Sequence, residues 1–122
     1  MITINDVPND TAIGFLQGAK APKERVYVSS CDKWLGAFDN GRIVGIIGLL
    51  GKRIRCFYVL KEYRRQGIGD TLLSALMEQS SQPWYSAYCT EYSRDMFKRH
   101  GFKYESYNTG TDIAFMRYKN ED

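Results

Sequence analysis

One segment of the chain combines glycines, arginines and a helical pattern in a way that suits phosphate chemistry. It reads Tyr58-Val59-Leu60-Lys61-Glu62-Tyr63-Arg64-Arg65-Gln66-Gly67-Ile68-Gly69-Asp70-Thr71. The first N–H groups of a helix have no intrahelical acceptor and carry part of the positive end of the helix dipole, so they suit a phosphate or diphosphate. Gly67 and Gly69 lack side chains that would keep such a group away, and Arg64 and Arg65 can bind phosphate oxygens in a bidentate fork. The segment therefore predicts an anion site at the start of a helix.

Spacing excludes the two best-known glycine-rich phosphate loops. A P-loop needs Gly-Lys followed by Ser or Thr, which this segment lacks. A dinucleotide fingerprint needs a third glycine where this chain has Leu72. The structural alternative is a solvated turn in front of a core helix, because loose Gly-x-Gly patterns also occur in such turns.

The elements that must position this segment are indicated by hydrophobic periodicity. Residues 53–60 predict a strand, and the pattern after Gly67 places one set of apolar residues on one helix face: Ile68, Leu72, Leu73, Leu76 and Met77. Upstream, residues 34–38 and 42–50 are β-prone and flank Asn40-Gly41, which supplies the positive φ angles of a tight hairpin turn. Together these runs predict a three-stranded meander that leads into a loop and a helix.

The rest of the chain predicts further strands and two shorter helices. Residues 84–89 are expected to form a strand parallel to residues 53–60, since the helix between them is long enough for a crossover. Thr90 or Ser93 can cap a second helix that Gly101 ends, and residues 103–107 and 112–118 predict a final hairpin. Residues 11–17 predict a short N-terminal helix. The expected fold class is α/β (α+β), a mixed, mostly antiparallel central sheet flanked by helices, with a shortened N-terminal helical region.

Composition limits the classes of protein that the chain can represent. With 122 residues, 43% hydrophobic and 25% charged, it predicts one globular domain over residues 1–122 rather than a disordered or fibrous chain. No apolar run approaches the ~20 residues that span a bilayer, and the N-terminus lacks a signal-peptide layout, so we expect a cytoplasmic protein without membrane contact. The formal charge of +3 permits phosphate ligands without indicating nucleic acid by itself.

The cysteines and the histidine do not form a metal-binding pattern. Cys31, Cys56 and Cys89 are too few and too widely spaced for a disulfide scaffold, and no pair has zinc-ligand spacing. We therefore expect reduced, mostly buried thiols and no metal. Neither Cys56 nor Cys89 has an activating neighbour in the sequence that would favour a covalent acyl carrier.

At this point the sequence resembles the GCN5-related N-acetyltransferases (GNAT). The family signature is Arg/Gln-x-x-Gly-x-Gly/Ala between a strand and a helix, which Arg64, Gly67 and Gly69 match in register, with Lys61 in place of a consensus proline. Downstream, residues 96–102 (Met-Phe-Lys-Arg-His-Gly-Phe) are similar to the late family helix that ends in Gly-Phe. The resemblance covers roughly the last two thirds of the chain.

The resemblance implies a binding site for acetyl-coenzyme A, with no metal. The diphosphate would lie on the N–H groups of Arg65, Gln66, Gly67, Ile68, Gly69 and Asp70, with the hydroxyl of Thr71 nearby. The pantetheine arm would lie along Tyr58, Val59 and Leu60 like an added strand, where this strand and residues 84–89 splay apart. The expected reaction is direct attack of a primary amine of a small molecule or a protein on the thioester. A backbone N–H of Val59 or Leu60 would stabilise the oxyanion.

The proton donor and the base stay open at this stage. In much of the family, a tyrosine four residues before the Gly-Phe glycine is the acid, and this chain has Phe97 there. Ser93 and His100 lie one turn earlier and three residues later on the same helix, and Tyr92 and Tyr88 flank the expected cleft. Ser93 has a capping role as its alternative, and His100 a packing or dipole role. The carboxylates considered as bases are Glu62, Glu91, Glu105 and Asp112.

Two other functions are consistent with the same residues. Phe97 and the short N-terminal region suit a coenzyme A-binding or structural module without catalysis. A set of basic residues suits acyl transfer to nucleic acid or aminoacyl-tRNA: Lys52, Arg53, Arg55, Arg64, Arg65, Lys98, Arg99 and Lys103. The sequence is consistent with a monomer or a homodimer.

Overall fold

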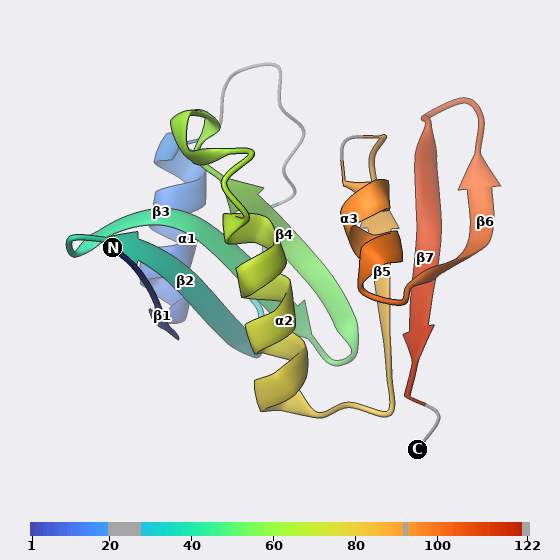
Figure 1. Ribbon diagram of the computed structural model, residues 1–122, viewed down its shortest axis with the longest axis horizontal. Helices are drawn as coiled ribbons and strands as arrows, with labels where there is room; N and C mark the ends of the chain where they lie inside the picture. Colours follow the sequence, from blue (N-terminus) through green and yellow to red (C-terminus); the bar gives the residue numbers. More distant parts are fainter. Residues whose placement is uncertain (20–27, 92, 121–122) are drawn as a thin grey trace.

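The computed structural model describes residues 1–19, 28–91 and 93–120, and within them a seven-stranded sheet with three α-helices (Figure 1). In chain order the elements are β1 (Ile2–Asp6), α1 (Asn9–Ala19), β2 (Lys33–Asp39), β3 (Arg42–Leu50), β4 (Arg53–Val59), the 3-10 helix η1 (Lys61–Tyr63), α2 (Ile68–Ser80), β5 (Trp84–Cys89), α3 (Arg94–Arg99), β6 (Lys103–Asn108) and β7 (Ile113–Lys119). No helix among these residues is both long and apolar enough to cross a membrane.

The strand order is β1-β2-β3-β4-β5-β7-β6, and only β4 and β5 pair in parallel. The predicted meander, the parallel crossover strand and the final hairpin are all confirmed. The hairpin turn between β2 and β3 has φ of 50° at Asn40 and 86° at Gly41, as the Asn-Gly pair predicts. The mixed, mostly antiparallel sheet flanked by helices is therefore the observed fold class.

Strand β1 was not among the predicted elements. The burial of its five residues alternates only weakly along the strand. It pairs antiparallel with β2 from Ile2↔Asp39 to Asp6↔Leu35 at one edge of the sheet. A run this short gains its stability from the neighbouring strand rather than from its own pattern. The predicted N-terminal helix is confirmed and is longer than expected, because α1 extends to Asn9 and Ala19.

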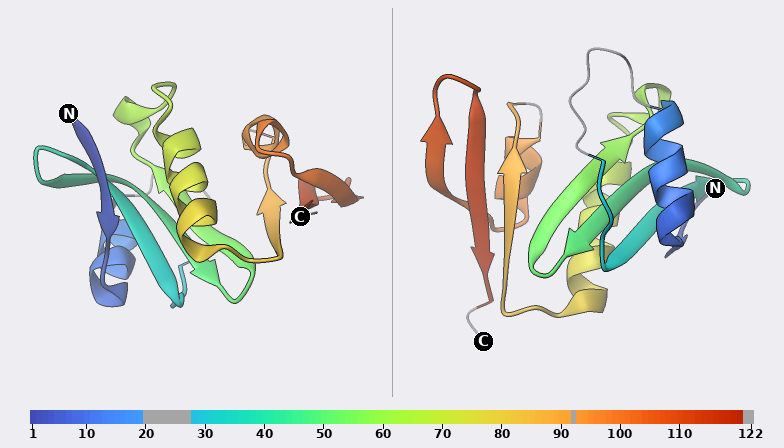
Figure 2. Two further views of the ribbon diagram at one scale, coloured as in Figure 1. Left: turned by 60° about the horizontal axis from the view of Figure 1, so that its bottom comes forward. Right: turned by 180° about the vertical axis from the view of Figure 1, so that it is seen from behind.

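The helices cover the sheet from two sides. In Figures 1 and 2, α2 and α3 lie over one face of the sheet, while α1 lies over the opposite face next to β2 and β3. The predicted apolar face of α2 is buried at Ile68, Leu72, Leu73 and Leu76. Gly45 on β3 permits this close approach, since a Cβ there would lie 3.3 Å from Leu72 and from Val59. Packing of α2 on β3 therefore fixes where the helix begins.

Candidate functional site

Strands β4 and β5 pair over a short stretch and then separate. The parallel ladder contains Arg53↔Ser86 and Ile54↔Ala87, and Ser86 N donates to Lys52 O at 2.9 Å. Beyond Ile54 the main chain of β4 no longer pairs with β5. The splay that the family resemblance implies is therefore present, and we refer to the side of β4 that is turned toward β5 beyond Ile54 as the open edge of β4.

A bulge in β4 sets which side chains line this edge. The pairing with β3 moves from Gly48↔Arg55 to Ile46↔Tyr58, so β4 has one extra residue, and Cys56 has a φ of 55°. After the bulge, Phe57 lies on the side of α2 and α3, where its ring is 6.0 Å from that of Phe97. This bulge could not be predicted from the sequence, because Cys56 is neither Gly nor Asn, the residues that favour a positive φ.

The direction of the main chain distinguishes the two predicted oxyanion donors. Leu60 N donates to Val44 O at 2.8 Å, so its N–H is used by the sheet and Leu60 is wrong as an oxyanion donor. Hydrogen bonds of an antiparallel ladder alternate, so the peptide groups of Val59 point away from β3. In agreement, Val59 O accepts a hydrogen bond from Arg64 Nε at 2.9 Å. The N–H of Val59 therefore points toward the open edge of β4.

The start of α2 presents main-chain N–H groups without protein acceptors. Gly67 is the N-cap, in the left-handed conformation with φ of 81°, and no side chain caps the helix. Within the described part of the chain, no acceptor takes the N–H groups of residues 65–70, and the first bonded amide is Thr71 N to Gly67 O at 3.0 Å. This is the arrangement that binds an anion at a helix N-terminus.

The side chains between β4 and the first turn of α2 differ in whether they contact protein atoms or solvent. The guanidinium of Arg64 turns back toward β4 and lies 5.2 Å from the centroid of the Tyr58 ring, whose hydroxyl donates to Ala19 O at 3.3 Å. Arg65 and Gln66 are exposed. The hydroxyl of Thr71 is exposed at the same helix start and donates to Gly67 O at 2.9 Å.

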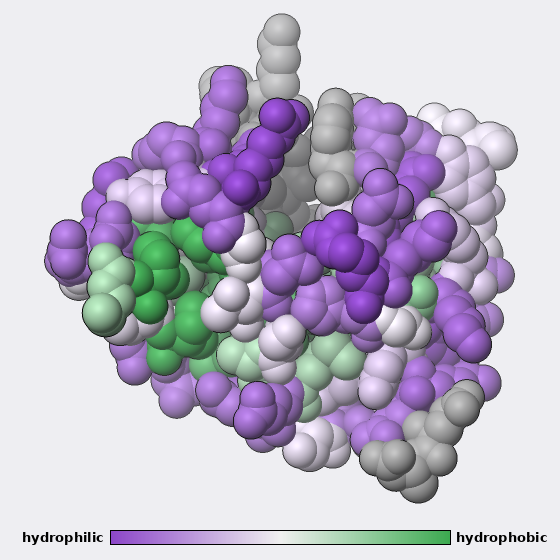
Figure 3. Space-filling model, in the orientation of Figure 1, coloured by the Kyte–Doolittle hydropathy of each residue, from purple (hydrophilic) through white to green (hydrophobic). Residues whose placement is uncertain are grey.

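Asp70 brings a carboxylate to the same helix end, and α3 neutralises it. Its Oδ1 lies 2.9 Å from His100 Nε2, and both oxygens accept from Arg99 at 3.1 Å. Burial alone would raise the pKa of Asp70, but the hydrogen bonds from His100 and Arg99 lower it below its ordinary value. The carboxylate therefore faces α3, while hydrophilic residues gather over the helix start and the end of α3 (Figure 3).

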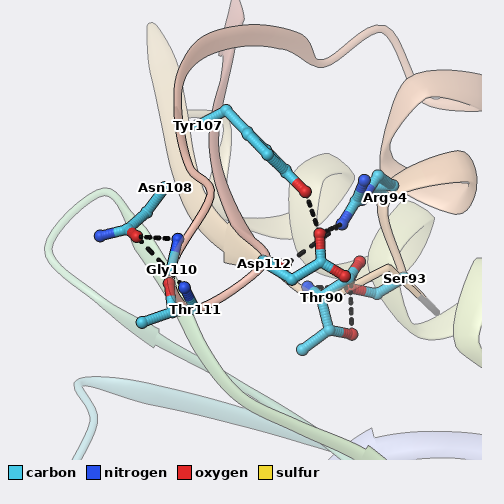
Figure 4. A network of polar contacts seen from close by, with 8 residues as sticks. All are labelled: Thr90, Ser93, Arg94, Tyr107, Asn108, Gly110, Thr111 and Asp112. Atoms are coloured by element: carbon cyan, nitrogen blue, oxygen red, sulfur yellow. Dashed lines mark hydrogen bonds and ion pairs between the residues drawn. The ribbon is translucent and has the colours of Figure 1, made fainter.

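The position of the usual family acid is filled by an apolar ring. Phe97 is 3% exposed and packs edge-on against Phe57 and Phe102. Ser93 begins α3 without a side-chain cap, because its Oγ accepts from Thr90 N at 3.1 Å instead (Figure 4). The predicted capping bond of Ser93 is therefore absent. Tyr92 lies outside the described residues.

Three of the four predicted bases form ion pairs with arginines. Glu62 is exposed and pairs with Arg42, while Glu105 pairs with Arg117 on the terminal hairpin. Asp112 accepts from Tyr107 and from Arg94, and these hydrogen bonds lower its pKa (Figure 4). A carboxylate with a lowered pKa is a weaker base. Glu91 is exposed at the end of the segment that follows β5.

Two of the cysteines form a pair that the sequence did not indicate. Cys31 and Cys56 each have a sulfur 3.9 Å from Ser29 O, across the bulge of β4. A hydrogen bond from Cys31 lowers the pKa of the Cys56 thiol to about 6, and the same contact raises the pKa of Cys31. Cys56 therefore has an activating neighbour, Cys31, that lies far from it in the sequence. Cys89 differs, because burial raises the pKa of its thiol to about 12. No cluster of potential metal ligands occurs within residues 1–19, 28–91 and 93–120.

Comparison with known proteins agrees with this geometry. The Acetyltransferase (GNAT) domain profile matches residues 22–104, so the chain belongs to the GNAT acetyltransferase family. No curated protein sequence matches the chain. The fold is similar to that of the IAA acetyltransferase from Bacillus cereus ATCC 14579, with a TM-score of 0.77, 18% identity, and coverage of 98% of this chain and 100% of that chain.

Two further solved structures place the chain in the same fold. The ribosomal-protein-S18-alanine N-acetyltransferase from Escherichia coli has a TM-score of 0.73 and 14% identity over 98% of this chain and 94% of that chain. The PaiA N-acetyltransferase from Thermoplasma acidophilum, solved in complex with coenzyme A, has a TM-score of 0.56 and 22% identity. That match covers 71% of this chain and 60% of the Thermoplasma chain.

Proposed function

We propose that this chain is an acetyl-coenzyme A-dependent N-acetyltransferase that acetylates a primary amine of a small molecule or a protein. The observation that carries the proposal is the run of N–H groups at residues 65–70, for which the described part of the chain offers no acceptor, next to the stretch of β4 that forms no ladder with β5. A diphosphate on these groups and an extended arm along β4 would use both features. The coenzyme A bound by the Thermoplasma relative supports this choice of ligand.

In this proposal the binding residues act mainly through their main chain. The amides of Arg65, Gln66, Gly67, Ile68, Gly69 and Asp70 bind the diphosphate. The side chain of Tyr58 supports Arg64 at the edge of the loop, and Leu60 keeps β4 attached to β3 through its N–H. The Thr71 hydroxyl, which donates to Gly67 O in the chain without ligand, lies one turn from these amides and would stand near the phosphates. Arg64, tied to Val59 O, supplies positive charge beside the helix end.

The acyl transfer itself would need three contributions from the protein. The amine attacks the thioester carbonyl, a C–N bond forms, and the C–S bond breaks to give an amide and free coenzyme A. The N–H of Val59 would donate to the developing oxyanion, a contribution of a few kcal/mol in acyl transfer. An alkylamine with a pKa near 10 must also lose a proton to a base or a water chain. Ser93 or Tyr92 would return a proton to the leaving sulfur, and the Ser93 hydroxyl would first have to give up its donation to Thr90 O.

Calorimetric titration and thiol release test the proposal in two stages. Acetyl-coenzyme A should bind at one site per chain, and the purified protein should release free thiol only when a suitable amine from a broad panel is present. Desulfo-coenzyme A, which keeps the diphosphate but cannot transfer an acyl group, should compete with the cofactor. No binding of acetyl-coenzyme A would overturn the proposal.

A second candidate function is coenzyme A binding without catalysis. The specific observation in its favour is Phe97, which is buried among Phe57 and Phe102 and leaves no hydroxyl where the family acid lies. In this case the titration would show binding, while the thioester would stay intact through long incubation with the amine panel. The two stages of the experiment therefore separate the two functions.

A further inference from the structure

One face of the terminal half of the sheet has no described helix over it. Seen from behind in Figure 2, β5, β7 and β6 face the viewer, and α3 lies on their far side. Large side chains of β5 are exposed on this face, with Trp84 38% and Tyr88 59% accessible. Cross-strand pairing places Phe115 opposite Tyr88 and Arg117 opposite the small Ser86. We refer to this surface as the open face.

Cations and aromatic rings form one continuous row across the open face. Lys52 lies 5.4 Å from the centroid of the Trp84 ring, and Arg117 lies 5.1 Å from the same ring and 5.9 Å from that of Phe115. The rings of Phe115 and Tyr88 are 5.0 Å apart, and the Arg53 guanidinium lies 5.0 Å from the Tyr88 ring. We call this row the cation–aromatic ladder: Lys52, Trp84, Arg117, Phe115, Tyr88 and Arg53.

Basic side chains outnumber acidic ones on this face. The whole chain has 17 basic and 14 acidic residues. In the described part of the chain, strand register and ring contacts assign to the open face and its rim the acidic Glu105, which pairs with Arg117, and the basic residues Lys52, Arg53, Arg55, Lys103, Arg117 and Lys119. Asp32, which accepts from Gly51 N at 2.8 Å, adds a second carboxylate at the rim beside Lys52. Among the described residues, six basic side chains against two acidic ones make this face positive in a chain that is almost balanced.

A hollow continues the ladder at the tip of the terminal hairpin. It has a volume of about 670 Å³, and Tyr88 and Phe115 of the ladder line it together with Ser106, Asn108 and Ile113. This volume is within the roughly 300–1,000 Å³ of small-molecule sites. Polar groups of Ser106 and Asn108 thus lie beside two aromatic rings at the end of a basic surface.

We propose that the open face binds single-stranded nucleic acid, with bases stacked on the cation–aromatic ladder and phosphates on its basic rim. Bases stack on aromatic rings and on guanidinium planes, and basic side chains follow the backbone in non-specific single-strand binding. A duplex does not fit this chemistry equally well, because its bases are stacked on one another. The surface is separate from the start of α2, which lies on the opposite side of the sheet (Figures 1 and 2).

Charge argues against a second copy of the chain as the occupant. A twofold interface through this face would bring the same basic residues of both copies together, and like charges in contact are unfavourable. An acidic peptide would match the positive charge of the face, but it would not stack on the aromatic rings and guanidinium groups of the cation–aromatic ladder. Single-stranded nucleic acid matches both features.

Fluorescence anisotropy with a labelled 12-nucleotide oligouridylate tests the proposal. In 50 mM salt the intact chain should bind the oligonucleotide, and the affinity should fall steeply as salt rises, because bound cations are released from the phosphates. Tyr88→Ala should weaken binding by about tenfold, since loss of one stacking platform has effects of that order. Arg53→Glu should weaken it further.

Matched variants on the opposite face provide the control. Tyr104 is 48% exposed with the Lys98 ammonium 5.6 Å from its ring, so it repeats the Tyr88–Arg53 contact away from the open face. Tyr104→Ala and Lys98→Glu should leave the affinity within about twofold of the unmodified chain. Circular dichroism and thermal unfolding of the variants confirm that each is folded.

Several results would overturn the proposal. The proposal is wrong if the chain does not bind the oligonucleotide at 50 mM salt. It is also wrong if Tyr104→Ala weakens binding as much as Tyr88→Ala does, or if a duplex of the same length binds with equal affinity. Displacement of the oligonucleotide by coenzyme A would assign the binding to the start of α2 instead. A concentration-dependent dimer in sedimentation that Tyr88→Ala dissociates would make the open face a contact between two copies.

Discussion

The imidazole Nε2 of His100 lies 2.9 Å from Oδ1 of Asp70, and this contact joins the end of α3 to the first turn of α2. Arg99 adds two hydrogen bonds of 3.1 Å to the same carboxylate. An acidic side chain at a helix start would ordinarily compete with an incoming anion. Here α3 binds the carboxylate and balances its charge, and under the proposed function this leaves the amides of residues 65–70 for a diphosphate.

This contact predicts an acid-dependent contribution to stability. The pKa of Asp70 is lowered in the folded chain, so the stabilisation is present above its unfolded value of about 3.9 and is lost as the pH falls through the folded value. Asp70→Asn should lower the free energy of unfolding at pH 7 by roughly 0.5–1 kcal/mol, since the pair is partly exposed and screened. Urea unfolding between pH 7 and pH 3 measures this.

Asp95→Asn is the matched control, because Asp95 is also a first-turn carboxylate. Asp95→Asn should lose only the small stabilisation that a carboxylate gains from the helix dipole. Its free energy of unfolding should not show the additional decrease at acid pH that the contact of Asp70 with α3 predicts. If both variants lose the same free energy at every pH, the contact between Asp70 and α3 contributes no stability.

Gly67→Val should abolish acetyl-coenzyme A binding with little loss of fold. A Cβ at Gly67 meets no protein atom within 4 Å, so valine would extend into the space that the ligand needs, and its φ of 81° adds local strain. Isothermal titration calorimetry gives the affinity. Gly41→Val shares the positive φ and the open surroundings but lies in the β2–β3 turn, and it should bind the cofactor normally. Equal affinities for both variants would contradict the diphosphate assignment.

Much of the fold and less of the site could be predicted from sequence. The Asn40-Gly41 turn and the apolar face of α2 have local causes, so their patterns were sufficient. The bulge at Cys56 and the bonding of Leu60 N–H to Val44 O depend on pairing between distant strands, which no local pattern encodes. The Cys31–Cys56 pair likewise depends on the fold bringing together residues far apart in sequence.

Removal of the Val59 N–H should affect turnover rather than binding. An amide-to-ester replacement at Val59, made by ligation at Cys56, should lower kcat by about 10²–10³-fold, the usual effect of losing one oxyanion donor. The same replacement at Leu60 removes the ladder bond to Val44 O, so it should reduce stability by about 1 kcal/mol and leave kcat unchanged. Thiol-release kinetics and urea unfolding separate the two effects, and the reverse pattern would reject the assignment of Val59.

Phe97→Tyr should not reduce thioester cleavage, and it should raise the rate if the proton donor limits turnover. The new hydroxyl would stand at the position of the usual family acid, although Phe97 packs closely against Phe57 and Phe102. Phe97→Leu keeps an apolar side chain without a hydroxyl and serves as the comparison. A large loss of activity with tyrosine, together with normal stability, would show that Phe97 shapes the acceptor pocket instead.

The Cys31–Cys56 pair predicts a thiol that titrates near neutrality. Thiolate absorbance at 240 nm should rise around pH 6 in the intact chain, and Cys31→Ala should move this titration toward pH 9 because the donor is lost. A lowered folded pKa stabilises the chain above the unfolded pKa and loses this effect as the pH falls through 6. The stability of the intact chain should therefore rise relative to Cys31→Ala between pH 6 and pH 9. Cys89→Ala should leave the titration unchanged, and a titration insensitive to Cys31→Ala would refute the pairing.

The most direct measurement is the response of the backbone amides of residues 65–70 to coenzyme A in ¹H–¹⁵N correlation spectra. If these groups bind the diphosphate, their signals should shift and their exchange with solvent should slow on addition of coenzyme A, while pantetheine, which has no diphosphate, leaves them in place. Saturating coenzyme A that shifts other amides and leaves those of residues 65–70 unchanged would contradict the account.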